Sequence, residues 1–202
     1  YEFANAGELM RDYEGWPQED FRKYQQFMLK VFYPAALDFL ERRHGTCAGS
    51  YWSNWGTANL LTLMSIGILC DDVYIYNKGL TYYKEKSGEA ESYHHLVWKL
   101  FEDERGPFGY FGQMQESNRD QGHSLMAVGI SSDICATALN QGDDLYTYDN
   151  DRIAAGFEYV AAYNSGVDDL PNSPYFRFFL SDCETEEYPV MGAGGRGANR
   201  PI

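Results

Sequence analysis

Three observations predict an all-α protein. Residues 19–43 carry apolar side chains, from Phe21 to Leu40, with the 3.6-residue period of an amphipathic helix. Residues 60–70 are apolar on nearly every face, which is typical of a helix buried on all sides. Further helical patterns follow, and no segment alternates long enough to predict a strand of consequence. Alternating buried and amphipathic helices indicate an all-α, double-layered architecture, and a helix buried on all sides is like the inner helices of a helical toroid.

Prolines, glycines and polar clusters place the ends of these helices. Pro34 is expected to kink the first helix, and His44-Gly45 to end it. After the buried helix, Asp71-Asp72 is expected to begin a more polar one. The remaining segments are expected to be helices over residues 94–101, 118–139 and 149–163, a loop over 106–112, a turn over 140–146, and an irregular, loop-rich tail over 165–202.

Length and composition place the chain among globular proteins. Its 202 residues suit a single domain. The long tail is uncommon in a compact domain, so residues 1–202 are expected to form only part of a domain that other segments of the same polypeptide complete. No run of 18 apolar residues and no signal peptide is recognisable, and a processed or trimmed start is expected.

The net charge of the chain limits the kinds of molecule that it can bind. A net charge of −14 speaks against nucleic acid and anionic membranes. If such a protein binds a polyanion, it must concentrate its few cations locally, which makes each arginine informative. Aromatic residues make up 16% of the chain and include 17 tyrosines, which suits a groove that stacks on sugar rings.

The cysteines and histidines give no sign of a metal or cofactor, and none is expected. Cys70 and Cys135 lie in apolar helical patterns and are expected to be buried thiols. Cys47 and Cys183 lie in loop-like sequence and could pair in a secreted protein. No Cys/His spacing matches a metal site.

The most informative stretch runs from Gln113 to His123, QMQESNRDQGH. Ser117, followed three residues later by Asp120, resembles a capping box, which predicts a helix beginning at residue 118. Arg119 and His123 would then lie one turn apart, with Asp120 beside the imidazole. A helix N-terminus favours anions, so these groups could form a site. The alternative is a structural Arg119–Asp120 ion pair beside a half-buried histidine.

Four segments together resemble a known family. They are YWSNWGTAN (51–59), IGILCDD (66–72), QESNRDQGH (115–123), and NQGDDLY (140–146) with GFEYVAAYN (156–164). They are similar to the alginate lyase superfamily, and most similar within it to polysaccharide lyase family 38, the glucuronan and alginate lyases. GRGANRPI (195–202) resembles a later loop of that family. The resemblance implies an incomplete (α/α) toroid that cleaves a 1,4-linked polyuronate by β-elimination.

The resemblance also implies roles for individual residues. Asn54 would bind the uronate carboxylate, although it could instead cap a helix. His123 would be the base or a second carboxylate partner, with Arg119 nearby. Tyr51, Trp52 and Trp55 would line the sugar subsites unless they pack in the core. The other expected substrate contacts are Gln115, Glu116, Asn118, Arg196 and Arg200.

Lyases of this superfamily need a proton-shuttling tyrosine, which the family places beyond Arg200-Pro201. Either that tyrosine belongs to a segment outside this chain, or Tyr163, Tyr175 or Tyr188 serves, with Tyr175 as the candidate taken here. The resemblance further implies secretion and an acidic polysaccharide as the partner.

Two other functions stay open at this point. An inverting glycoside hydrolase would need two separated carboxylates, for which Asp71-Asp72 and Asp143-Asp144 are candidates. A fragment that lacks the tyrosine would bind polysaccharide without cleaving it.

Overall fold

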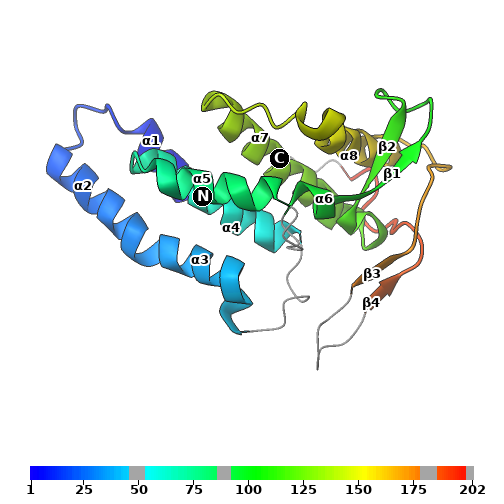
Figure 1. Ribbon diagram of the computed structural model, residues 1–202, viewed down its shortest axis with the longest axis horizontal. Coiled ribbons are helices and arrows are strands. Elements are labelled where there is room, and N and C mark those ends of the chain that lie inside the picture. Colours follow the sequence, from blue (N-terminus) through cyan, green and yellow to red (C-terminus); the bar gives the residue numbers. More distant parts are fainter. Residues whose placement is uncertain (46–52, 86–91, 178–185, 199–202) are drawn as a thin grey trace.

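The computed structural model describes residues 1–45, 53–85, 92–177 and 186–198 (Figure 1). Helices account for 63% of the structure and strands for 8%, which confirms the all-α class. The described ranges form no closed barrel, as expected for a partial toroid. No helix within them has both the length and the apolar character needed to cross a membrane.

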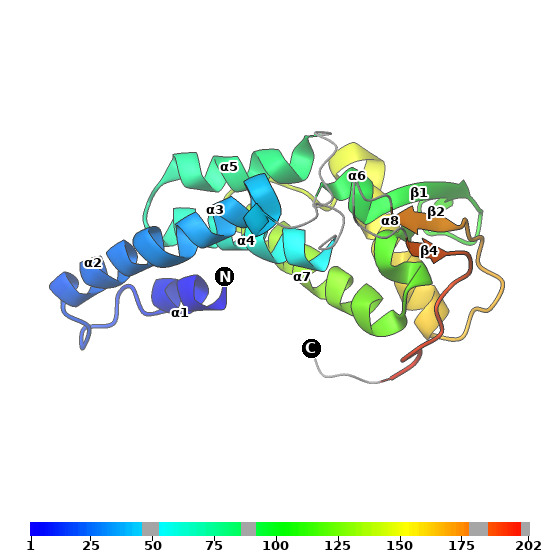
Figure 2. The ribbon, with the colours of Figure 1, turned by 90° about the horizontal axis from the view of Figure 1, so that it is seen from below.

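Helix α4 (Asn54–Leu69) lies at the centre of the protein. It contacts α1 (Glu2–Leu9), α3 (Tyr33–Arg42), α5 (Val73–Lys84) and α7 (Gln121–Asn140), and Figure 2 shows α4 and α7 side by side. The prediction of a helix buried on all sides is therefore confirmed. Its fully buried apolar side chains are those of Leu60, Leu61, Leu63, Met64, Ile66 and Leu69.

At the position of the kink expected from Pro34, the helix contains a π-helical turn. Helix α2 (Gln18–Phe27) continues through a π-helical turn, η1 (Met28–Phe32), into α3. Pro34 has no N–H for the helical ladder, and its ring displaces the preceding carbonyl, so the backbone widens there. The chain ends α3 with Arg43 and His44 in left-handed conformations. Helix α1 was not predicted from the sequence.

Helices α4 and α5 approach closely at a glycine. A Cβ on Gly67 would lie 2.4 Å from the backbone nitrogen of Tyr76 in α5. Because backbone atoms cannot move aside as a side chain can, Gly67→Ala should force the helices apart and cost about 2–4 kcal/mol of unfolding free energy. Denaturant melts will measure the loss. Gly129→Ala is the matched control: a Cβ there meets nothing within 4 Å, so the helical alanine should be neutral or slightly stabilising. Equal melts for both variants would contradict the close-packing explanation.

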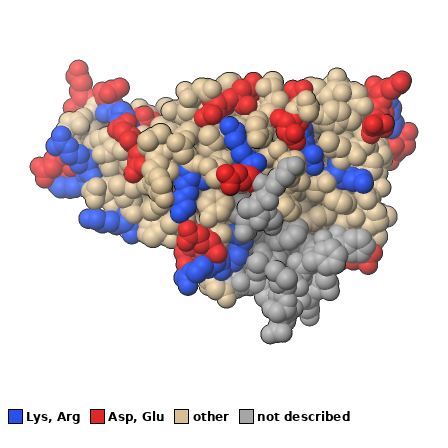
Figure 3. All heavy atoms as spheres, in the orientation of Figure 1, with Lys and Arg blue, Asp and Glu red and all other residues tan. Residues whose placement is uncertain are grey.

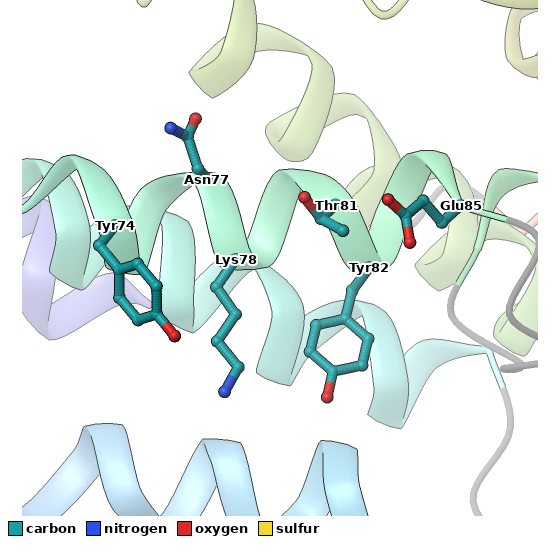
Figure 4. A pocket seen from close by; sticks show the side chains of 6 residues that line it. All are labelled: Tyr74, Asn77, Lys78, Thr81, Tyr82 and Glu85. Carbon is teal, nitrogen blue, oxygen red and sulfur yellow. The ribbon is translucent and has the colours of Figure 1, made fainter.

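A groove of about 380 Å³ runs along the exposed face of α5. Figure 4 shows Tyr74, Lys78 and Tyr82 projecting from α5 toward α3, while Asn77 points away. The Lys78 ammonium lies 3.1 Å from the Glu41 carboxylate of α3. This cation therefore links two helices of the protein.

The helix predicted over residues 94–101 is wrong for most of its length. Helix α6 (Tyr93–Leu96) is a single turn, and β1 (Val97–Glu102) follows it. Strand β1 pairs antiparallel with β2 (Tyr110–Met114), which begins inside the predicted loop. A short apolar run with aromatic residues suits either a helix or a strand, and the Gly-Pro-rich connection makes the hairpin possible. The hairpin packs on α8 (Tyr148–Asn164).

The tail after α8 is mostly irregular in its described part. It contains two three-residue strands, β3 (Tyr175–Arg177) and β4 (Glu186–Tyr188), which pair with each other. Cys135 is a fully buried free thiol, as expected, whereas Cys70 is a free thiol that is only partly buried. Cys47 and Cys183 lie outside the described residues.

Candidate functional site

The helix that carries His123 begins later than the sequence suggests. A 3₁₀ turn, η4 (Gln115–Asn118), precedes α7, and Asp120 is the N-cap. Ser117 is not the cap: its carbonyl instead accepts a hydrogen bond from the N–H of Gly192 in the tail. The predicted pairing of Asp120 with His123 is confirmed. One carboxylate oxygen accepts the backbone N–H of His123 at 2.9 Å, and the other lies 2.6 Å from its Nδ1.

This pairing fixes the protonation pattern of the imidazole. Burial alone would raise the pKa of Asp120, but the backbone N–H and the ring of His123 outweigh it and hold that pKa below its ordinary value. An ionised carboxylate accepts a hydrogen bond from Nδ1–H, which keeps the proton of the neutral ring on Nδ1 and leaves Nε2 as its basic nitrogen. The His123 side chain is 36% exposed, so its outer edge can be reached from solvent.

Asn54 joins the N-terminus of α4 to that of α7. Its Nδ2 donates a 3.0 Å hydrogen bond to the backbone carbonyl of His123. The residue is buried, and its Oδ1 has no hydrogen-bond partner among the described residues. Leaving an acceptor unsatisfied in this way costs about 1–3 kcal/mol. Ser53, just before it, has a φ of 52° and a ψ of −99°, a strained conformation of the kind that gathers at functional sites.

The first turns of two long helices therefore meet at one place. Helices α4 and α7 have 16 and 20 residues, and the bond from Asn54 to His123 links the beginning of one to that of the other. Backbone N–H groups at a helix start have no partner within the helix, and the helix dipole adds positive potential there. At the start of α7 these N–H groups are engaged, because the Gln121 N–H donates to the Gly194 carbonyl and the His123 N–H to the Asp120 carboxylate. Within the described ranges, the start of α4 has no side-chain cap, so its positive potential suits an anionic group.

Arg119 is not part of α7. It lies between η4 and Asp120, so the predicted spacing of one helical turn from His123 is wrong. Its Nη1 is 3.6 Å from the buried Glu116 carboxylate, and its side chain is 36% exposed. A Cβ on Gly192 would lie 2.4 Å from the Arg119 carbonyl, so the tail passes directly against this segment.

The aromatic residue Trp55 lies on the surface rather than in the core. It is 58% exposed and stacks on Phe39 with ring centroids 6.0 Å apart. An exposed ring held by a second ring provides a flat apolar surface beside Asn54. Three further residues expected to contact substrate, Tyr51, Trp52 and Arg200, lie outside the described residues.

The side-chain amides of residues 113–121 form hydrogen bonds with the backbone of the irregular tail. Asn118 Nδ2 donates to the carbonyls of Ser173 and Tyr188 at 3.0 and 2.8 Å. Gln121 Nε2 donates to the carbonyl of Gly192 at 2.8 Å. Gln113 exchanges hydrogen bonds with the backbone of Ser173. Because the tail has little secondary structure, its backbone groups need such partners. This role was missed in the sequence, where Asn118 was read only as a substrate contact.

Gln115 forms a hydrogen bond with Tyr175, the candidate proton-shuttling tyrosine. Its Nε2 donates to the Tyr175 hydroxyl oxygen at 2.5 Å, and the Tyr175 ring packs on Trp98. Gln115 Oε1 is buried without a hydrogen-bond partner among the described residues. The hydrogen bond from Nε2 fixes the position of the Tyr175 hydroxyl.

The other candidate residues of the tail are tied to structure. The Arg196 guanidinium lies over the Tyr163 ring at 4.0 Å, donates to the Tyr163 carbonyl, and pairs with Asp168. The Tyr188 carbonyl accepts from Asn118. Arg196 and Tyr163 thus fasten the end of α8 to the tail.

The two aspartate pairs considered for hydrolysis have structural partners. Asp72 caps α5 and Asp144 accepts from Thr147, while Asp71 pairs with Arg11 at 2.8 Å. Asp143 accepts a hydrogen bond from the Tyr76 hydroxyl at 2.9 Å. The described part of the chain contains no group of three or more His, Cys, Asp or Glu residues that could hold a metal.

Comparison with known proteins identifies the family of this chain. The alginate lyase family matches the chain over residues 2–170, which include all of the Asn54, Asp120 and His123 cluster. Neither a curated protein nor a solved structure gives a significant match. The matched range spans most of the 202 residues, and the chain belongs to the alginate lyase family, a family of polysaccharide lyases.

Proposed function

We propose that the protein cleaves a 1,4-linked polyuronate, glucuronan or alginate, by β-elimination at the joined N-termini of α4 and α7. One observation carries the proposal: a histidine oriented by a carboxylate lies against an asparagine that has an unsatisfied buried acceptor. Because polyuronates are extracellular polymers, the proposal also places the protein outside the cell.

The reaction first requires the substrate carboxylate to be neutralised. The proton at C5 of a uronate becomes acidic only when the adjacent carboxylate is bound by positive charge or N–H donors. The N-terminus of α4 supplies positive potential, and Asn54 has a second amide N–H beyond the one given to His123. Arg119 supplies a full charge nearby in sequence.

Proton transfer then involves a base and an acid. His123 Nε2 takes the C5 proton, a C4=C5 double bond forms, and the C4–O bond breaks. Asp120 stabilises the imidazolium that results, as a carboxylate beside an imidazole does in other enzymes. The departing O4 needs a proton, for which Tyr175 is the proposed donor, with Gln115 holding its hydroxyl in position. Trp55 offers the surface on which a sugar ring can stack.

Arg119→Ala should lower kcat/KM by about 10- to 100-fold, the range expected when a charged hydrogen-bonding group is lost. The melting temperature should change little, because a partly exposed ion pair contributes at most about 1 kcal/mol. Initial rates on alginate and thermal melts measure both quantities.

Glu116→Gln is the control for this experiment, because it removes the carboxylate that Arg119 approaches. If Arg119 serves only to support Glu116, the two variants will lose stability and activity together. That result would remove Arg119 from the site.

An absorbance time course tests the function directly. Elimination leaves an unsaturated sugar end that absorbs in the ultraviolet, whereas hydrolysis leaves only a reducing end. The protein should generate absorbance on glucuronan or alginate and none on a neutral β-1,4 glucan. Inertness on both polyuronates, together with new reducing ends on the neutral glucan, would overturn the proposal.

A further inference from the structure

A second surface on the protein combines cations with exposed apolar side chains. Arg22, Gln26 and Lys30 line one groove of about 540 Å³ along α2 and η1, together with Phe27 and Val31. We call this groove the α2 groove. Figure 3 shows Lys and Arg atoms interspersed with Asp and Glu atoms over the end of the molecule that α2 forms.

Three cations of the described chain line the α2 groove, and two of them, Arg22 and Lys30, differ from most others, whereas Lys23 is ion-paired. Arg11, Arg42, Lys78, Lys84, Arg105, Arg119 and Arg196 each lie within 4 Å of a carboxylate. Among the described residues, Arg22 and Lys30 form no ion pair. Glu19 also lines the groove, but its carboxylate is 2.9 Å from the ammonium of Lys23. The Asp20 carboxylate lies 3.1 Å from the same ammonium. In a chain of net charge −14, the α2 groove therefore keeps two cations that no described carboxylate pairs, Arg22 and Lys30, beside a compensated Lys23.

The apolar part of the groove is held in place. Phe27 is 46% exposed and Val31 49%. The Phe27 ring packs edge-on against Phe32, with centroids 5.4 Å apart, and Phe32 packs against Phe3. An exposed aromatic ring in a groove that Arg22 and Lys30 also line suits a ligand that has both apolar ring faces and negative charges. A uronate chain has both features.

We propose that the α2 groove is a second binding site for the polyuronate chain, separate from the Asn54–His123 site. The inference rests on the proposed function for the choice of ligand. Charge complementarity selects an anionic polysaccharide over a neutral one. The α5 groove is a weaker candidate, because its Lys78 is already paired with Glu41. A long chain held at the α2 groove has a raised effective concentration at the catalytic site.

Affinity electrophoresis in gels that contain alginate tests binding without relying on cleavage. Lys30→Ala should raise the apparent Kd about two- to fivefold, and Arg22→Ala/Lys30→Ala about tenfold, since exposed charge pairs contribute modestly. Lys99→Ala is the matched control, because Lys99 is another exposed lysine without an ion pair among the described residues. It should leave the Kd unchanged. Retardation should weaken with added salt and be absent in a neutral glucan gel.

Kinetics separate this site from the catalytic one. The double variant should raise KM on long polyuronate several-fold with kcat unchanged, and should behave as wild type on oligomers too short to reach both sites. Equal alginate binding by wild type and the double variant overturns the second site, even where cleavage is intact. So does an equal loss in Lys30→Ala and Lys99→Ala, which indicates a net-charge effect. If no polyuronate is cleaved but the α2 variants still lose binding, the proposed function fails and this site stands.

Discussion

His123→Ala should reduce turnover on polyuronate by about 10²- to 10⁴-fold, the usual contribution of a positioned acid–base group. The fold should survive, because the contacts that His123 makes with Asn54 and with one Asp120 oxygen come from its backbone, which alanine retains. The ring itself is partly exposed and fills no core position. Initial rates of ultraviolet absorbance, with a thermal melt of the same sample, measure the two effects separately.

The pH dependence supplies a second check on His123. Only the neutral imidazole can accept the C5 proton, so the wild-type rate should show a limb that rises with pH. The variant should lack that limb. If the alanine variant keeps more than about a third of wild-type turnover, far above the expected range, His123 is structural and the base lies elsewhere.

The sequence predicted the fold class because its strongest signals are local and periodic. The all-round apolar pattern of residues 60–69 could only belong to a buried helix, and α4 is one. The hairpin β1–β2 escaped prediction because its pairing depends on contacts with α8, which no local pattern reveals. The start of α7 was misplaced for a similar reason. Ser117 has the right chemistry for a cap, but its carbonyl is engaged by the distant Gly192.

The candidate site was predicted only in part. The three-residue spacing of Asp120 and His123 is a local relation, and it holds in the structure. The bond between Asn54 and His123 joins residues 69 positions apart, so only the family resemblance could suggest that they meet. The role of Asn118 in holding Ser173 and Tyr188 depends on a tail with no periodic pattern. One feature of the sequence could have predicted this role. A sequence that contains both a cluster of Asn and Gln residues and a long irregular segment indicates that the amides can bond the backbone groups of that segment.

Asp120→Asn should lower turnover about 10²- to 10⁴-fold while the protein stays folded. Asparagine caps a helix as well as aspartate does, so its Oδ1 can keep the bond to the His123 N–H. Its NH₂ group would then face Nδ1, which can accept this bond only without a proton. The imidazole must therefore carry its proton on Nε2, and in that tautomer the outward nitrogen is no longer a base.

Asp120→Ala and the pH dependence of stability separate this tautomer effect from capping. Alanine also removes the helix cap. The unfolding free energy of Asp120→Ala should therefore be about 0.5–2 kcal/mol lower than that of Asp120→Asn. The pKa of Asp120 is lower in the folded protein than in the unfolded chain, where it is about 4. The ionised carboxylate therefore stabilises the fold above the unfolded pKa. This stabilisation disappears as the pH falls through the pKa of the folded protein. Denaturant melts of wild type and Asp120→Asn should therefore converge in acid. An asparagine variant that retains more than half of wild-type turnover would show that Asp120 caps α7 without orienting the base, because the expected effect of the wrong tautomer is at least about 100-fold.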